Sequence, residues 1–400
     1  MKVVVKPSGR RIAPFQDAVS EIQVLGRSLS ALMEEEFERA GLTLVNDPPQ
    51  DEAYLLVSDR TWVTGAALAA FVKEASPGER LKVSNELWLE LTTPLQDLPE
   101  AGLYEVAVLP AGSEPHFEGL TPLVLDLQVE EREAPKEHPA LAHAMPKVLP
   151  FTDAAIVQVD HWSHILQANW MAISSTFARE GRLFKRKGVF AKVWGLLRLF
   201  WKTRSLSKWK LARGLSHIPK TASVHPTAVV ELSVIGEHAE IGPYAVIRGS
   251  VVGDHVRVEE HAIVNASVLG EGARVGKRGT ANLCVLYPEA FVSAGAGHQA
   301  CVFGRQAFLA WSVTTYDLSF GSPIKVQKDG ERISSGVFFL GSAVGHRAKI
   351  GGHVQLGYGT EVPNDAVLVG ETASVFKRWE EGRGPHRVEH GVARPIKTGD

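Results

Sequence analysis

Ten apolar residues in the C-terminal half recur on a 17-residue repeat, and this repeat constrains the fold more than any other feature of the chain. The spacings run six, five and six residues and then start again, so each repeat holds three short segments. The ten residues are Val224, Val230, Ile235, Ile241, Ile247, Val252, Val258, Val264, Leu269 and Val275. A hexapeptide-type repeat of this kind is typical of a parallel β-helix with three faces per coil.

The repeat also predicts how such a helix is filled. One branched apolar residue per face would fill a narrow triangular core, because alternate side chains of a strand point inward. Many of these residues precede Gly, as in Ile235-Gly236, and we expect these glycines to adopt positive φ at the corners. The pattern resumes at Val344, Ile350, Leu356, Val362 and Leu368. No 3.6-residue period is present, so we predict a left-handed parallel β-helix over residues 216–376.

Length and cysteine content bound the remaining possibilities. A chain of 400 residues is long enough for two domains. Its two cysteines, Cys284 and Cys301, exclude a disulfide framework and fit a reducing cytosol. No apolar run approaches the length of a membrane span, and the N-terminal run is too short for a secretory signal. We therefore expect a cytoplasmic protein.

Residues 1–175 alternate apolar strands with helical stretches. The predicted strands are 3–5, 54–57, 123–125 and 155–157, and the predicted helices are 29–40 and 66–75, the second with Thr64 as its N-cap. This alternation predicts a Rossmann-like α/β domain with a mainly parallel sheet. Ligands bind beyond the carboxyl ends of such strands, where Asp59 and Asp160 stand. Four prolines in residues 134–150 predict a loop or linker.

A basic segment joins the two halves. Between Phe177 and Arg213 there are twelve Lys and Arg residues, seven aromatic residues and a single acid, Glu180. Residues 189–203 fit an amphipathic helix. This composition is typical of a helix that lies on an anionic membrane surface, and docking on an acidic face of this protein or of a partner is an equal alternative. No nucleic-acid-binding motif is present, so no nucleic acid is expected.

The predicted organisation therefore has four parts. They are an α/β domain over 1–175, a basic helical linker over 176–215, the β-helix over 216–376 and a polar, extended tail over 377–400. Residues 325–330 interrupt the second set of repeats and predict a protruding hairpin or loop. If the linker binds membrane, the protein would be peripheral at the inner membrane face.

His298 lies in the irregular stretch between the two sets of repeats. β-helices form active sites in clefts between coils or subunits, and neutral His suits a general base near pH 7. The stretch Gly297-His298 resembles the Ala-Gly-His segment of the bifunctional N-acetylglucosamine-1-phosphate uridylyltransferase/glucosamine-1-phosphate acetyltransferase family. Thr315-Tyr316-Asp317 resembles the same family's Asn-Tyr-Asp stretch.

That resemblance implies a role for two residues. His298 would be the acetyl-transfer base, with Tyr316 in the same site and acetyl-CoA or another acyl-CoA as co-substrate. Cys301 stands where the family has Tyr, and a simple solvated turn is the alternative for His298. His346 and His353 fall in ordinary repeat turns and are expected to be structural.

The loop after the first strand carries a second resemblance. Gly9, Arg10 and Arg11 are what remains of the Gly-x-Gly-x-Arg phosphate loop of sugar-nucleotide pyrophosphorylases, in which backbone N–H groups and a cation hold a triphosphate. Pro7 removes one of those donors. Residues 17–22 stand where shortened, divergent uridylyltransferase-like proteins carry an Arg-Pro-Val-x-(Asp/Glu)-Leu stretch. A plain surface turn with arginines is the alternative.

Two aspartates complete the candidate site. Asp59 follows a strand where the pyrophosphorylases keep a metal-binding Asp, and Asp160 resembles their second metal position. Mg²⁺ is usually held by one or two carboxylates together with phosphate oxygens. It would neutralise charge as a sugar phosphate attacks the α-phosphate. Helix capping is the alternative role for strand-end aspartates.

Taken together, the sequence predicts a sugar-phosphate nucleotidyltransferase/acyltransferase-like enzyme of nucleotide-sugar metabolism. Its substrates would be a sugar phosphate and a nucleoside triphosphate. Prisms of this kind usually pack three together, so we expect a homotrimer. The alternative is a catalytically degenerate ligand-binding or membrane-surface scaffold protein with the same fold.

Overall fold

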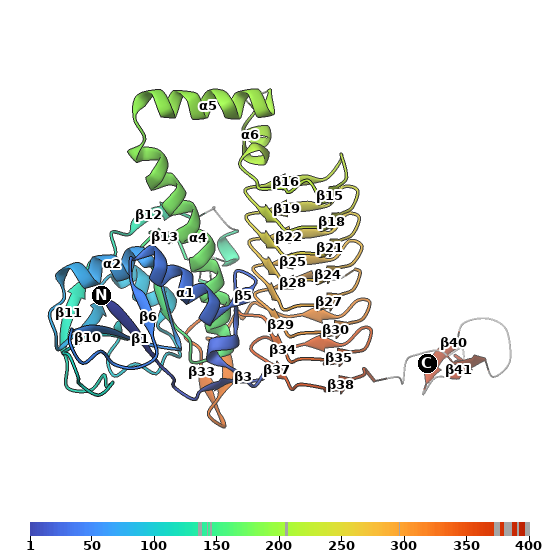
Figure 1. Cartoon of the computed structure of the whole chain (residues 1–400). Helices are drawn as coiled ribbons and strands as arrows, with labels where there is room; N and C mark the ends of the chain where they lie inside the picture. The colour runs from blue at the N-terminus through green and yellow to red at the C-terminus, as the bar shows by residue number, and fades with distance from the viewer. Residues whose placement is uncertain are drawn as a thin grey trace.

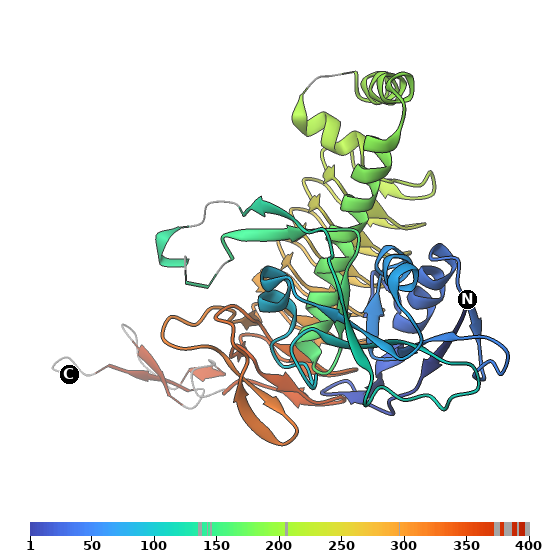
Figure 2. The ribbon, with the colours of Figure 1, turned by 90° about the vertical axis from the view of Figure 1, so that its left-hand side faces the viewer.

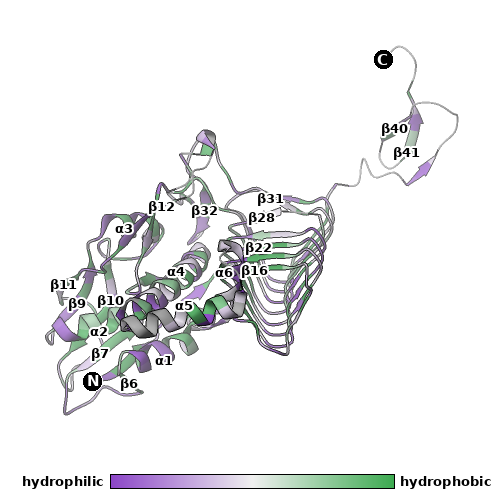
Figure 3. Ribbon diagram, turned by 90° about the horizontal axis from the view of Figure 1, so that it is seen from above, coloured by the Kyte–Doolittle hydropathy of each residue, from purple (hydrophilic) through white to green (hydrophobic). Residues whose placement is uncertain are grey.

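The protein consists of an α/β domain, a helical arm and a three-sided prism (Figure 1). The computed structural model describes residues 1–134, 138–141, 143–144, 146–204, 207–295, 297–371, 377–379, 386–389 and 392–396. The α/β domain lies beside the lower half of the prism, and the arm rises between them and crosses to the top of the prism (Figures 1 and 2). Seen from above, the prism has a triangular outline (Figure 3).

The α/β domain is built on one six-stranded sheet. Its strands are β1 (Lys2–Lys6), β6 (Thr43–Val45), β7 (Tyr54–Ser58), β9 (Glu79–Val83), β10 (Leu103–Leu109) and β11 (Thr121–Leu125), in the order β11-β9-β10-β7-β1-β6. β1 runs parallel to β6 and β7, whereas β10 is antiparallel to both β7 and β9. The Rossmann-like layering is confirmed, and β10 makes the sheet mixed.

Smaller elements surround this sheet. They are β2 (Arg11–Ile12), β3 (Asp17–Ala18), β4 (Gln23–Val24), β5 (Arg27–Ser28), β8 (Thr61–Val63), β12 (Glu130–Glu133), β13 (Val148–Phe151), β14 (Ile156–Gln158) and two 3-10 turns, η1 (Val19–Glu21) and η2 (Pro139–Leu141). The predicted strand 155–157 corresponds to β14, which pairs antiparallel with β8 outside the main sheet. The predicted loop 134–150 includes residues 135–137, 142 and 145, which lie outside the described residues.

The described helices are α1 (Leu29–Arg39), α2 (Gly65–Glu74), α3 (Glu86–Thr92), α4 (Trp162–Arg186), α5 (Val189–Thr203) and α6 (Lys208–Gly214). Side chains cap the first turns of four helices, α1 to α4. The Thr64 hydroxyl accepts the Ala67 N–H, which confirms the predicted N-cap of α2. α4 is 25 residues long and crosses the predicted boundary at residue 175. Among the described helices, none is long and apolar enough to cross a membrane.

The C-terminal half is a left-handed parallel β-helix whose coils follow the predicted register. Ile247 pairs with Val230 on one side and with Val264 on the other, each 17 residues away. The first face holds β15 (Ser223–Val224), β18 (Glu240–Ile241), β21 (Arg257–Val258), β24 (Arg274–Val275), β27 (Phe291–Val292), β30 (Phe308–Leu309), β35 (Lys349–Ile350) and β38 (Val367–Leu368). All ten residues of the first repeat set are buried or half-buried, and Leu368 at the far end is exposed.

Two further faces close the prism. The second face holds β16 (Val229–Glu231), β19 (Val246–Arg248), β22 (Ile263–Asn265), β25 (Thr280–Asn282) and β28 (Gly297–Gln299), followed by the separate pair β31 (Thr314–Thr315) and β36 (Gln355–Leu356). The third face holds β17 (Val234–Ile235), β20 (Val251–Val252), β23 (Val268–Leu269), β26 (Val285–Leu286), β29 (Val302–Phe303), β34 (Ala343–Val344) and β37 (Glu361–Val362). The predicted hairpin is β32 (Lys325–Lys328) with β33 (Glu331–Ser334). In the tail, β39 (Arg378–Trp379), β40 (His386–Glu389) and β41 (Val392–Pro395) are described.

The glycines that follow the inward residues do not have the conformational role expected of them. Gly236 and Gly253 are absent from the positive-φ residues, whereas His238 and His255, two positions further on, have φ of 56° and 57°. A Cβ on Gly236 would lie 2.5 Å from the carbonyl carbon of Gly253 in the next coil. Glycine is therefore required there because the coils approach closely, and the expectation of positive φ was wrong.

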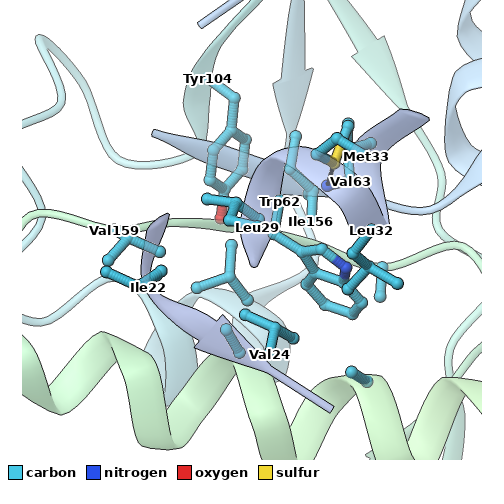
Figure 4. Close-up of a cluster of buried hydrophobic side chains, with 14 of the residues drawn as sticks. Ile22, Val24, Leu29, Leu32, Met33, Trp62, Val63, Tyr104, Ile156 and Val159 are labelled. Carbon is cyan, nitrogen blue, oxygen red and sulfur yellow. Dashed lines mark hydrogen bonds between the residues drawn. The ribbon is translucent and has the colours of Figure 1, made fainter. Parts of the chain in front are cut away.

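One hydrophobic core continues from the α/β domain into the prism. It includes Trp62 and Tyr104 from the domain and Tyr287 and Val302 from the third face. Figure 4 shows part of it, where Val24 and Trp62 lie together. A second core fills the inside of the prism. The two halves are thus packed as one body, with α4 against the third face.

Candidate functional site

Three cationic side chains from separate segments meet at the carboxyl ends of β1 and β7. We call them the cation cluster: Arg10 from the loop after β1, Arg60 from the turn after β7, and Lys328 from the β32–β33 hairpin. The Arg10 guanidinium donates to Asp160 Oδ1 at 2.6 Å, and Arg60 donates to the same oxygen. The side chain of Asp160 is completely buried, so the site has one central carboxylate.

A second carboxylate, Asp97, joins the cluster from the loop after α3. It accepts from both Arg10 and Lys328, and its backbone N–H donates to Asp160 Oδ2 at 2.8 Å. Lys328 also donates to the carbonyl of Leu95 at 2.8 Å. The hairpin of the C-terminal half therefore reaches into the site of the N-terminal domain, although the sequence predicted only that it protrudes.

The electrostatics of the cluster are governed by burial and compensating charge. Burial alone would raise the pKa of Asp160, but attraction to Arg60 and the hydrogen bond from Asp97 hold that pKa below its ordinary value. Burial would lower the pKa of Arg60, but hydrogen bonding to Glu105 and attraction to Asp160 raise it. Asp160 is therefore ionised and Arg60 is protonated at neutral pH.

A buried histidine fixes the position of Asp160. His164 Nδ1 accepts the backbone N–H groups of Asp160 at 2.9 Å and of His161 at 3.1 Å, and its Nε2 donates to the carbonyl of Pro94 at 2.8 Å. Burial lowers the pKa of His164 to about 4, so the ring is neutral. This residue orients the strand end and has no free nitrogen for a ligand.

The predicted phosphate loop is only partly assembled in this site. Gly9 has φ +68° and open space around its Cα, which leaves the backbone accessible. Arg10 belongs to the cation cluster. Arg11 instead donates to the carbonyl of Gln16 at 2.6 Å and lies outside it. The structure therefore separates the two arginines that the sequence grouped together.

The two aspartates predicted to hold magnesium do not fit that role. Asp59 Oδ1 accepts the Ser8 N–H at 2.9 Å and so holds the loop, whereas both oxygens of Asp160 are taken by arginines, Asp97 and Gln158. Within the described part of the chain, no group of three or more His, Cys, Asp or Glu side chains could hold a metal ion. Two guanidinium groups supply the positive charge that a cation would bring, so we derive no step through Mg²⁺.

His298 lies inside the prism rather than at a cleft. It pairs with Ala281 in the inward column of the second face, and its side chain is completely buried. Its Nδ1 is 3.3 Å from Thr315 Oγ1, its Nε2 has no hydrogen-bond partner, and its ring packs on Phe303. Burial lowers the pKa of His298 to about 4. A base for acyl transfer must touch the acceptor, and this imidazole touches only the interior.

The interior polar group around His298 also contains both cysteines. Cys301 Sγ lies 3.4 Å from Thr315 Oγ1, and Cys284 Sγ donates to the carbonyls of Asn282 and His298. Both thiols are free and buried, and burial raises the pKa of the Cys284 thiol. We interpret this group as a polar layer within an apolar core.

Tyr316 and Asp317 directly follow β31, one coil beyond His298. Tyr316 is 48% exposed, and its hydroxyl donates to Gln355 Oε1 at 3.0 Å. Asp317 is half-buried, and burial raises the pKa of its carboxyl. A carboxyl whose pKa is raised by its surroundings is suited to proton transfer. Among the described residues next to His298, Asp317 combines partial exposure with a raised pKa.

Asp17, at the start of the stretch 17–22, lies between the two halves of the chain. It accepts from Arg305 at 2.7 Å and from His346 Nε2 at 3.1 Å. Phe15 stacks on Tyr287 next to this pair. These residues join the domain to the third face, so His346 has a structural role, as expected from its repeat turn.

One cavity lies away from the cation cluster. It has a volume of about 630 Å³ and is bounded by α1, α2, α4 and the first coils of the third face. Its walls are mainly apolar, including Leu32, Trp62 and Val234, with Arg179 and Arg186 among them. A second hollow of about 580 Å³ lies on the charged ladder of the first face. Neither contains a residue that the sequence predicted for catalysis.

Sequence reasoning missed three residues of this site, namely Arg60, Asp97 and Lys328. Arg60 directly follows Asp59 at a strand end, so its position could have been inferred. Asp97 and Lys328 carry no such signal, because only tertiary folding brings them within reach of Asp160.

One family model matches part of the prism. Residues 212–306 match the model of the GMPPB C-terminal domain, which supports the resemblance to a nucleotidyltransferase/acyltransferase-like family. No curated protein matches the chain.

Similar solved structures include several transferases. A GDP-perosamine N-acetyl transferase from Caulobacter crescentus, crystallised with CoA and GDP-perosamine, is 17% identical over 39% of this chain and 53% of its own, with a TM-score of 0.13. A UDP-N-acetylglucosamine O-acyltransferase from Moraxella catarrhalis is 12% identical over 35% of this chain and 65% of its own, with a TM-score of 0.17. This chain therefore spans less than two thirds of either protein. The polySia-specific acetyltransferase NeuO is 14% identical over 45% of this chain and 84% of its own, with a TM-score of 0.14.

Proposed function

We propose that this protein is a transferase of nucleotide-sugar metabolism whose α/β domain binds the phosphate of a sugar phosphate or nucleotide sugar at the cation cluster. One observation carries the proposal: Arg10, Arg60 and Lys328 converge on two carboxylates beneath the Gly9 loop, at the carboxyl ends of parallel strands. Ligands of open α/β sheets bind at this edge, and guanidinium groups favour phosphate.

Arg10 is the group that would meet the phosphate. Its side chain is 25% exposed, whereas Arg60 and Lys328 are 14% and 10% exposed. The two carboxylates hold Arg10 in place before a ligand arrives, which reduces the entropy lost on binding. Arg60 is fixed on its other side by Glu105, with which it forms two hydrogen bonds. Arg60 would therefore keep Asp160 neutralised while the Arg10 guanidinium, still in place, also binds the phosphate.

Binding can be measured by titration calorimetry with UTP and with UDP-N-acetylglucosamine. In Arg10→Ala, loss of one charge-assisted hydrogen bond, worth about 1.5–3 kcal/mol, should weaken binding by roughly 10- to 100-fold. Arg11→Ala is the matched control and should leave affinity unchanged, because Arg11 lies outside the cluster. Equal losses in the two variants, or no binding by wild type to any nucleotide or sugar phosphate, would contradict the proposal.

Reaction type is tested separately from binding. Nucleotidyl transfer would release pyrophosphate from a nucleoside triphosphate and a hexosamine phosphate. Because the aspartates do not fit a magnesium site, we expect binding without pyrophosphate release. Release at a substantial rate that is lost in Arg10→Ala would instead establish nucleotidyl transfer at the cluster.

Acyl transfer from acetyl-CoA or another acyl-CoA is the second candidate, and the position of Asp317 favours it. The exposed Tyr316 and the half-buried Asp317 directly follow Thr315, which lies one coil from His298. If Asp317 takes the proton from an amino sugar, thiol release from acetyl-CoA should fall at least tenfold in Asp317→Asn, since proton transfer contributes about 10²–10⁴-fold to rate. Thiol release that survives in this variant, or that wild type lacks with every amino sugar, would exclude this role.

A further inference from the structure

The inner side of α5 is covered by its neighbours. A Cβ on Gly195 would lie 3.5 Å from the Phe184 ring of α4, and a Cβ on Gly214 of α6 would lie 2.7 Å from Leu199 and 2.5 Å from Thr203. Gly195, Leu199 and Thr203 are four residues apart and so share one side of the helix. That side therefore faces α4 and α6.

The opposite side of α5 carries large apolar side chains that the described structure leaves exposed. Trp194, Leu197 and Trp201 occupy positions i, i+3 and i+7 and are 71%, 44% and 73% exposed. α5 crosses from α4 to α6 at the end of the molecule, and its outer side faces away from both the domain and the prism (Figures 1 and 2). A soluble helix normally turns its apolar side inward, and here the apolar side is outermost.

Positive charge borders this apolar side. Arg198 and Arg204 are exposed and stand on either side of the two tryptophans around the helix. The wider segment from Phe177 to Arg213 contains twelve Lys and Arg residues against one acid. An acidic protein face would be met by cations at the centre of the contact. Tryptophans at the centre with cations at the edges match lipid chains bordered by anionic headgroups.

We propose that α5 lies flat on an anionic phospholipid surface, with Trp194, Leu197 and Trp201 among the headgroups and Arg198 and Arg204 on lipid phosphates. Because α5 runs across the prism axis (Figure 1), the prism would then stand upright on the membrane. The cation cluster would face the aqueous side at some distance from the lipid. The inference is independent of the proposed function of that cluster.

Vesicle sedimentation tests the proposal with the full chain. Wild type should bind vesicles of phosphatidylcholine mixed with phosphatidylglycerol and should not bind phosphatidylcholine alone. Binding should weaken as salt rises, because the attraction is screened over about 10 Å at 0.1 M. Equal binding to neutral vesicles, or no binding to anionic ones, would overturn it. Self-association of wild type that disappears when Trp194 and Trp201 are replaced would also overturn it. A second copy of the chain would then cover this side of α5.

Matched variants locate the contact. Trp194→Gln with Trp201→Gln should reduce the partition coefficient at least tenfold, whereas Trp311→Gln should leave it unchanged, because Trp311 is 66% exposed on the prism. Arg198→Gln and Arg204→Gly should each lower the partition coefficient about fivefold, because a cation near the surface contributes about 1 kcal/mol. Gly suits residue 204, whose φ is 46°. Circular dichroism checks that α5 remains helical, and a folded double tryptophan variant that binds like wild type would overturn the proposal.

Discussion

At the scale of single residues, the inward column of the second face decides what His298 can do. The column runs Val230, Ile247, Val264, Ala281 and His298, with one residue per coil. Counting seventeen residues twice from Val264 reaches His298, so its inward position could have been predicted from the repeat. The motif resemblance predicted a catalytic base, whereas the 17-residue register predicts a side chain in the core. The register was the stronger physical constraint.

Burial of His298 has a consequence for pH. The folded-state pKa is about 4, below the ordinary 6.5, so the unfolded chain binds a proton that the folded chain excludes between these values. Stability is therefore lost as pH falls from 6.5 towards 4. A shift of this size corresponds to roughly 3 kcal/mol. His298→Val, which restores the column's residue type, should remove that share of the pH dependence, as measured by urea unfolding at several pH values.

The control for this measurement is an exposed histidine of the prism. His225→Val should show the same loss of stability towards low pH as wild type, because residue 225 is exposed. His164 remains in all three proteins and contributes equally to each. If His298→Val keeps the full wild-type slope, the imidazole must be accessible to protons, and the buried interpretation of His298 is wrong.

The residues of the cation cluster show where sequence reasoning stops at this scale. Arg10 was identified from the resemblance of its loop to a phosphate loop, and Asp160 from its position at a strand end. Asp97 and Lys328 were not, because their meeting depends on a hairpin more than 200 residues away along the chain folding back over the domain. Local sequence patterns predict strand ends well. They do not predict which charged residues, distant in the sequence, will form ion pairs.

At the scale of elements, two helices were predicted closely from their residue pattern. Residues 189–203 form α5 with the expected bounds, and Thr64 begins α2. β14 was predicted as a strand but not as the partner of β8, because an apolar run does not specify its neighbours. The β32–β33 hairpin was predicted as an interruption of the coils, but its contact with the domain was not.

That hairpin should stabilise the interface between the two halves. Lys328 is 10% exposed and is bonded to both Leu95 and Asp97. Lys328→Met should lower the free energy of unfolding by about 1–3 kcal/mol, because a largely buried hydrogen-bonding group is removed and its carbonyl partner is left unsatisfied. Urea unfolding measures this change. Lys325→Met at the exposed start of β32 is the control, and equal stability of the two variants would contradict a clamping role.

At the scale of the whole molecule, the repeat specified the prism almost completely. It did not predict that the α/β domain packs against the prism. The domain and the prism share one hydrophobic core, and Asp17 links them through Arg305 and His346. Composition suggested two bodies joined by a basic linker. The residues that join them, such as Phe15 and Tyr287, look like ordinary core residues in the sequence. They therefore did not predict an interface.

The faces of the prism differ in what they offer to further copies of the chain. The third face is occupied by α4 and the domain. On the first face, Glu240 and Arg257 form part of an outward charged ladder. The second face instead presents an outward apolar ladder, in which Val229 pairs with Val246 and Val246 with Ile263. Association that buries this ladder is favoured, because apolar area is removed from water.

The predicted homotrimer should therefore form through the second face. Light scattering after size exclusion should give three times the protomer mass of 43.5 kDa. Ile263 is 36% exposed, so Ile263→Glu is compatible with a folded protomer, but it would bury a carboxylate at the contact and should yield monomers. Val367→Glu, at a position 67% exposed on the first face, should remain trimeric. A monomeric wild type would refute the trimer, and an Ile263→Glu trimer would move the contact to another face.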